Sequence, residues 1–218
     1  WEREDQSARE QARILSSFYG FPLRTENADG QVVELFRFQG GVPQYRQTDN
    51  INAAISTRAN LLWPGGSSGL NLTGLGVELG VWDGGAVLAE HRELIGRVTQ
   101  RDNGSKVDHA THVAGTMIGL GVDANARGMA NQATLSAFDW NNDFAERARA
   151  ALGGLGISNQ SYGWVVGWSF NARGDNRWLW YGDRTVSQTE DWQWGAYSDI
   201  DQRIDATTYF APNYLTVW

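Results

Sequence analysis

The chain has 218 residues and a net charge of −7, and 41% of its residues are hydrophobic, which suits one large domain or one domain with a small appendage. The acidic balance argues against nucleic-acid partners and against docking on anionic membranes, because both need clustered Lys and Arg. The absence of Cys excludes disulfides and thiolate metal sites, and no apolar run is long enough to cross a membrane.

Residues 1–66 are predicted to form a small segment with a helix and a β-hairpin. Apolar side chains recur at spacings of three to four over 8–18, and two extended runs flank Gly40-Gly41. The predicted elements are a helix over 1–19, strands over 32–38 and 42–46, and a helix over 51–62. A cluster of Pro, Gly and Ser at 64–69 marks the boundary with a second domain, 67–218.

Strands and helices alternate after residue 76. The predicted elements are a strand over 77–81, a helix over 109–119, a strand over 133–140, a helix over 143–152, a strand over 157–161, a helix over 189–208 and a last strand over 214–218. This order predicts an α/β fold in which a parallel sheet carries helices on both faces. Asp143 and Glu146 have the spacing of a capping box at the start of their helix.

The segment 163–188 is rich in Trp and Gly and is predicted to be a long surface excursion. Most of the 11 Trp residues of the chain follow residue 160. Clustered Trp side chains usually serve packing, so we favour that interpretation. A carbohydrate-binding role for 163–194 is the alternative.

Functional sites of parallel sheets lie beyond the carboxyl ends of the strands, and two polar side chains are predicted to lie there. Asp83 follows the strand that begins at residue 77, and His109 begins the next helix. His109 and His112 share one helix face, and by themselves both would suit contacts with turns or backbone. A metal site would need a third and a fourth ligand, and nothing nearby has that spacing, so no metal is predicted at these histidines.

Three motifs in their order along the chain resemble the subtilisin-like serine peptidases. The motifs are Val81-Trp82-Asp83-Gly84-Gly85, His91-Arg92-Glu93-Leu94 and His109-Ala110-Thr111-His112-Val113-Ala114-Gly115-Thr116. In that family a strand ends in Asp-Thr/Ser-Gly, His-x-x-Leu follows, and His-Gly-Thr-His-Val-Ala-Gly-Thr opens a helix. The sequence departs from the pattern at Ala110, a change that a helix tolerates. The resemblance covers roughly residues 72–218 and is nearest to large secreted bacterial members.

The resemblance implies a role for five residues. Asp83 would accept the Nδ1–H of His109 and fix the tautomer of the imidazole, and His109 would act as general base and then as general acid. The segment Ser161, Tyr162 and Gly163 is similar to the strand that lines the family's cleft. Its backbone would bind an extended peptide substrate, a role that we favour over that of an ordinary core strand.

Other polar residues are interpreted as structural. His112 is expected to be satisfied inside the helix packing, and His91 to serve a turn or the packing. A cluster of acidic and amide side chains could hold a structural Ca²⁺, although a solvated helix cap explains it as well and is preferred. The members of this cluster are Asp139, Asn141, Asn142 and Asp143. The implied chemistry requires no cofactor.

The family's nucleophile lies in Gly-Thr-Ser-x-Ala/Ser, downstream of an Ala-Gly-Asn that supplies the oxyanion-hole side chain, and neither segment occurs in the 218 residues. The chain alone is therefore expected to be inactive. A continuation or a partner polypeptide that carries Asn and Ser is expected to complete the domain. Residues 1–66 could be a remnant of a propeptide or an appended interaction module.

Two functions of different classes follow. The first is a secreted endopeptidase that acts on peptide or protein substrates, with Asp83 and His109 in this chain and Ser elsewhere. The second is a catalytically inactive component with the same fold, structural or binding, in an extracellular assembly. The presence of a Gly-Thr-Ser segment in the same protein separates the two.

Overall fold

The computed structural model describes residues 2–26, 32–39, 42–47, 50–163, 166–170, 173 and 175–218. The chain forms two compact units and passes between them several times. One unit comprises 1–77, 90–97 and 112–134, and the other comprises 78–89, 98–111 and 135–218. The division into 1–66 and 67–218 that the sequence indicates stays a prediction.

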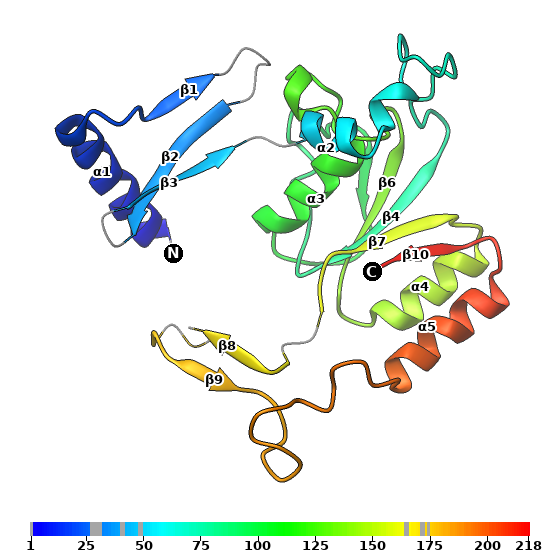
Figure 1. Ribbon diagram of the computed structural model, residues 1–218. Helices are drawn as coiled ribbons and strands as arrows, with labels where there is room; N and C mark the ends of the chain where they lie inside the picture. Colours follow the sequence, from blue (N-terminus) through cyan, green and yellow to red (C-terminus); the bar gives the residue numbers. More distant parts are fainter. Residues whose placement is uncertain are drawn as a thin grey trace. The chain divides into compact units, whose positions relative to one another are not determined.

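The first unit begins with a helix that packs on a three-stranded antiparallel sheet (Figure 1). The elements are α1 (Glu2–Tyr19), β1 (Arg24–Glu26), β2 (Val32–Gln39) and β3 (Val42–Gln47). Ala12 and Ser16 of α1 are buried, as is Leu35 of β2. The predicted helix and hairpin are confirmed, although the turn residues Gly40 and Gly41 lie outside the described residues.

The helix predicted over 51–62 is in two pieces. The observed elements are α2 (Asn50–Ser56) and the 3-10 helix η1 (Ala59–Leu61). Arg58, between them, adopts a left-handed conformation with φ of 61°. A non-glycine residue in this region interrupts a right-handed helix, which the apolar periodicity does not reveal.

A buried carboxylate fixes the loop that follows the helix α3 (Asp108–Ile118). Glu93 is 4% exposed and accepts hydrogen bonds from the backbone N–H groups of Gly121, Val122 and Asp123. Such contacts satisfy a charge that would be costly to bury alone. Within the same unit, Gly128 crosses Gly119 so closely that a Cβ on Gly128 would clash with backbone.

The second unit is built on a five-stranded sheet in the order β10-β7-β4-β6-β5 (Figure 1). The strands are β4 (Glu78–Asp83), β5 (Val98–Gln100), β6 (Thr134–Asp139), β7 (Ile157–Gln160) and β10 (Leu215–Val217). The pairs β10–β7, β4–β7 and β5–β6 are parallel. The helices α4 (Asp143–Leu152) and α5 (Asp199–Phe210) contact each other and lie side by side. The predicted α/β fold with a parallel sheet flanked by helices is confirmed, and β5 is an additional strand.

Trp82 lies at the centre of this sheet. It is fully buried, and its ring stacks on Phe138 of β6 with 4.3 Å between centroids and 3° between planes. Its indole N–H donates to Glu146 Oε2 over 3.1 Å. Partial burial raises the pKa of Glu146, and repulsion by Asp102 and Asp139 adds to this rise.

The helix predicted over 189–208 begins only at Asp199. Ser198 forms a capping box with Asp201. The Ser198 hydroxyl accepts the backbone N–H of Ile200, and the Asp201 carboxylate accepts the backbone N–H of Ser198. The capping box predicted at Asp143 and Glu146 is wrong, because the N-cap Asn142 has a left-handed φ of 63° and makes no side-chain cap bond. A Ser and an acidic residue three positions later therefore cap the later helix, at a start that was not predicted.

The Trp-rich segment contains a two-stranded antiparallel hairpin, β8 (Trp168–Phe170) and β9 (Trp178–Trp180). The expectation that these Trp side chains serve packing is wrong for most of those that the structure describes, which do not include Trp164. Trp168 is 53% exposed, Trp178 62% and Trp194 70%. Composition alone does not reveal this exposure, which arises because a short hairpin has too few neighbours to cover large rings.

The glycine crossing provides a matched pair of substitutions. We expect Gly128→Ala to destabilise the protein by about 2 kcal/mol, since the clash involves backbone that cannot rotate away. Gly115→Ala, in α3 with nothing within 4 Å of the added Cβ, should stabilise it by about 0.5–1 kcal/mol. Urea unfolding measures both. Equal effects would contradict the close crossing.

The environment of Glu146 predicts a pH dependence. Its raised pKa means that the folded state binds this proton more tightly, so the contribution is favourable below that pKa and is lost as the pH rises through it. Glu146→Gln keeps an acceptor for Trp82 and removes the charge. We expect the melting temperature to rise by about 1–2 °C at pH 7 and not at pH 4. A gain of the same size at both values would contradict the electrostatic origin.

Candidate functional site

Asp83 and His109 form a hydrogen-bonded pair in the second unit. His109 Nδ1 lies 2.8 Å from both carboxylate oxygens of Asp83. The Asp83 side chain is 4% exposed, whereas that of His109 is 58% exposed. A buried carboxylate that contacts Nδ1 orients the ring and leaves Nε2 for proton transfer. The two side chains are thus in contact, and the catalytic roles expected for them stay a prediction.

The local sequence explains how the pair is positioned. Asp83 is the last residue of β4, and its Oδ1 also accepts the backbone N–H of Gly84. Gly85 comes next, and its backbone passes close to Ser105. A Cβ at Gly85 would lie 2.5 Å from the carbonyl oxygen of Ser105, so this position requires glycine. His109 is the second residue of α3. The strand end and the helix start thus bring an acid and an imidazole together across 26 residues of sequence.

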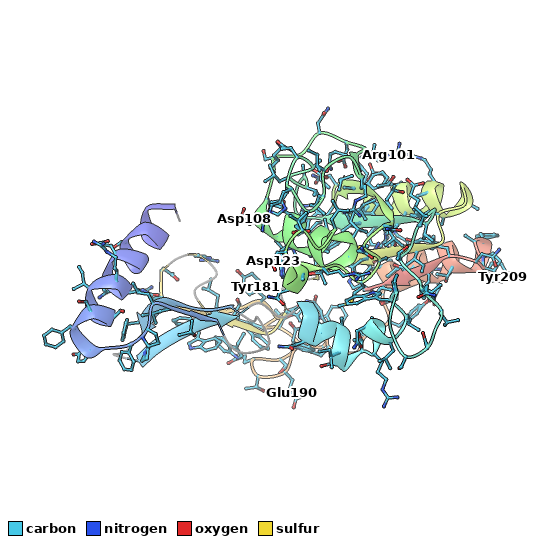
Figure 2. The ribbon with its side chains drawn as sticks, turned by 90° about the horizontal axis from the view of Figure 1, so that it is seen from above. Arg101, Asp108, Asp123, Tyr181, Glu190 and Tyr209 are labelled. Atoms are coloured by element: carbon cyan, nitrogen blue, oxygen red, sulfur yellow. The ribbon has the colours of Figure 1, made fainter. Side chains whose placement is uncertain are left out.

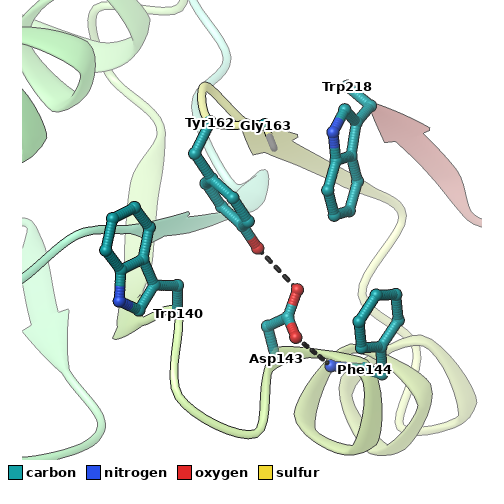
Figure 3. Close-up of a pocket in the computed structure, with 6 residues that line it drawn as sticks. All are labelled: Trp140, Asp143, Phe144, Tyr162, Gly163 and Trp218. Carbon is teal, nitrogen blue, oxygen red and sulfur yellow. Dashed lines mark hydrogen bonds between the residues drawn. The ribbon is translucent and has the colours of Figure 1, made fainter. Parts of the chain in front are cut away.

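An aromatic pocket of about 310 Å³ lies in the same unit (Figure 3). Its lining is mainly apolar and comes from the loop before α4, from α4, from the residues after β7 and from the residue after β10. The residues are Trp140, Asp143, Phe144, Tyr162, Gly163 and Trp218. Pockets of this composition, with a few placed polar groups, are typical of ligand sites.

A buried ion pair supports this pocket. Asp143 and Arg147 are one helical turn apart in α4, with 3.5 Å between Asp143 Oδ2 and Arg147 Nη2. The same carboxylate oxygen accepts a 2.6 Å hydrogen bond from Tyr162 (Figure 3). The Arg147 guanidinium lies over the rings of Phe144 and Trp218, at 4.7 and 4.6 Å from their centroids. Burial and the bond to Asp143 raise the pKa of Tyr162, which keeps it a neutral donor.

The pocket adjoins the Asp83–His109 pair. A Cβ on Gly84, the residue after Asp83, would lie 3.2 Å from the ring of Trp140. The charge of Asp83 also contributes to raising the pKa of Tyr162, as a nearby anion does. The acid–imidazole pair and the aromatic walls are therefore neighbours in the second unit.

The three residues predicted to line a cleft lie directly after β7, outside the strand. Ser161 is exposed, and its hydroxyl accepts from Asn159. Tyr162 and Gly163 are walls of the pocket. The peptide-binding role of the three residues stays a prediction.

Sequence reasoning missed the aromatic walls and their support. Trp140, Phe144 and Trp218 come from three different elements, so no local spacing relates them. A signal was available for Arg147, since Asp143 and Arg147 stand at i and i+4 in a predicted helix. Such pairs are usually exposed, and burial of this one is decided by the tertiary fold.

The interpretation of the remaining polar residues is corrected in part. His112 is exposed on α3 and does not lie inside the helix packing. His91 serves a turn, which was one of the two roles expected for it, and its Nδ1 accepts the backbone N–H of Glu93. In the cluster considered for Ca²⁺, Asp139 bonds the backbone and side chain of Asn141. No three His, Cys, Asp or Glu side chains of the described residues are grouped as a metal site requires.

A scan against protein-family models found no match to this sequence, and neither did a search of curated proteins. In the described part of the chain, no helix combines the length and apolar character needed to cross a membrane.

The buried ion pair predicts a non-additive mutant cycle. Arg147→Met leaves the Asp143 charge without its cation, and we expect a loss of about 3 kcal/mol in the free energy of unfolding. Adding Asp143→Asn to the Arg147→Met variant removes that charge and should restore at least half of the lost free energy of unfolding. Urea unfolding of the wild type, the two single variants and the double variant measures the coupling. Additive effects would contradict a buried, coupled pair.

Proposed function

We propose that the protein is a serine endopeptidase that hydrolyses peptide bonds, with Asp83 and His109 as two members of its catalytic triad. One observation carries the proposal: a buried carboxylate contacts Nδ1 of a half-exposed imidazole at 2.8 Å. Three motifs that resemble those of the subtilisin-like peptidases support it, because the paired residues are the ones that those motifs single out. A parallel α/β sheet, with the pair at a strand end, is consistent with it.

The chemistry divides between the two residues and a nucleophile outside residues 1–218. Asp83 fixes the tautomer that carries the proton on Nδ1 and stabilises the imidazolium that forms during reaction. His109 Nε2 takes the proton of the serine hydroxyl as that oxygen attacks the carbonyl carbon. It then donates the proton to the leaving amine. The serine and the oxyanion-hole Asn belong, in this proposal, to a continuation of the chain or to a partner polypeptide.

The aromatic pocket beside the pair would hold one side chain of the substrate. Its carboxylate, Asp143, is paired with Arg147 and bonded by Tyr162, so it is not available to select a basic side chain. The remaining walls are aromatic, apart from Gly163. The proposed substrate is therefore an extended peptide with a large uncharged side chain at this position, bound by the backbone of 161–163. Secretion is part of the proposal and rests on the resemblance.

A catalytically inactive binding or structural component is the second candidate. The observation in its favour is that the 218 residues contain no serine in a Gly-Thr-Ser context. In that case the Asp83–His109 pair would serve only the packing of the strand end against the helix.

Peptide mass mapping of the purified natural protein, together with a serine-directed fluorophosphonate probe, separates the candidates. We expect a stoichiometric polypeptide beyond Trp218 that carries Ala-Gly-Asn and Gly-Thr-Ser segments and is labelled by the probe. In the complete assembly, His109→Ala should lower kcat/KM for a peptide substrate on the order of 10⁴-fold or more. His112→Ala, an exposed histidine three residues along the same helix, is the matched control and should retain activity.

Full peptidase activity in the His109→Ala assembly would overturn the assignment. An intact, folded protein without a probe-reactive serine would instead establish the non-catalytic candidate.

A further inference from the structure

Four aromatic side chains form a strip on one face of the β8–β9 hairpin, which we call the aromatic strip: Trp168, Phe170, Trp178 and Trp180. Trp168 pairs with Trp180, and Phe170 with Trp178, each with 5.3 Å between ring centroids. Paired residues of an antiparallel ladder share a face, and positions two apart return to it about 7 Å further on. The rings therefore follow one another along the hairpin.

The aromatic strip is exposed to solvent over most of its length. Trp168, Phe170 and Trp178 are each more than half exposed, and Trp180 is partly buried. Large apolar patches on a protein surface commonly mark binding sites. A role in the hydrophobic core of the described structure would require these rings to be covered.

The aromatic strip continues into a hollow of about 510 Å³ with a mixed lining. The residues around it are Val166, Gly167, Trp168, Trp180, Thr189, Glu190, Asp191 and Trp194. Asp191 is structural, since its two carboxylate oxygens accept the backbone N–H groups of Gly167 and Gln193. Thr189 and Glu190 are exposed at the rim, and the Glu190 side chain is labelled on its loop in Figure 2.

This combination fits a sugar chain. A pyranose ring has a face of C–H groups, which can stack on an indole, and an edge of hydroxyls, which can donate to a carboxylate and accept from a hydroxyl. The aromatic strip offers the stacking surface, and Thr189 and Glu190 offer the polar rim. A row of rings, in place of a single one, suits a polymer that extends over several sugar units.

Two other ligand classes fit less well. The described residues that line the hollow include carboxylates and no Lys or Arg, which disfavours nucleic acid and other polyanions. An ammonium cage requires rings spread around the cation. Here the two rings of each pair lie 5.3 Å apart and are tilted by 48° and 53°, so the partners contact each other and leave no space for a cation between them.

We propose that the aromatic strip and the adjoining hollow bind a neutral polysaccharide. The site is separate in sequence from Asp83 and His109 and requires no peptidase activity. In this proposal the 168–194 segment tethers the protein to a glycan surface.

Native gel electrophoresis of the purified chain tests the proposal, in gels that contain hydroxyethylcellulose, galactomannan or soluble starch. We expect at least one of these polysaccharides to retard the wild type. Trp168→Ala and Trp178→Ala should each weaken the binding about tenfold, as loss of one stacking contact does. Tyr209→Ala removes a 78% exposed ring on α5, away from the aromatic strip in sequence, and should leave the retardation unchanged.

Urea unfolding of each variant checks that the fold is retained, which the exposure of both Trp side chains predicts. The proposal is overturned if none of the three polysaccharides retards the wild type. It is also overturned if the two Trp variants migrate as the wild type does in the retarding gel. Quenching of Trp fluorescence by tetramethylammonium chloride, without retardation by any polysaccharide, would assign the site to cations instead.

Discussion

The central strand β4 is the constraint on which the second unit depends. After Glu78 each of its residues is buried, and it lies between β7 and β6 in the sheet. Continuous burial requires apolar or fully satisfied side chains along the strand, and Val81 and Trp82 meet this requirement. Asp83 ends the strand with a charge, which is tolerated because His109 and the Gly84 N–H contact its oxygens. The position of the acid–imidazole pair is therefore a consequence of where the buried strand ends.

Buried polar contacts also fix the strand at the other side of the site. Ser158 and Gln160 of β7 bond each other, Ser158 bonds the Tyr214 hydroxyl, and Thr216 of β10 donates to Gln160. These contacts add to the parallel ladder between β7 and β10 and specify one register, since a slip would leave buried groups without partners. The register in turn places the chain that leads to Trp218 at the aromatic pocket.

The two surfaces described above differ in how they are supported. The pocket beside Asp83 rests on the buried Asp143–Arg147 pair and on rings held in contact with the guanidinium. The aromatic strip rests on a short ladder whose rings contact mainly each other, with Asp191 anchoring the adjacent turn. The first surface is thus shaped by the core of the sheet, and the second is an exposed platform that a ligand can approach from solvent.

By itself, the sequence determined the α/β fold, a strand end next to Asp83 and a helix start within one residue of His109, because apolar alternation and helical spacing are local signals of burial. It also indicated the hairpin and helix of the first unit. The start of α5, the break at Arg58 and the exposure of the Trp side chains were decided by the tertiary structure. The aromatic pocket was decided there too, since Trp140, Phe144 and Trp218 meet only when the parallel sheet brings separate elements together. Local patterns record which residues avoid water, whereas contacts between distant residues depend on the register and packing of the folded chain.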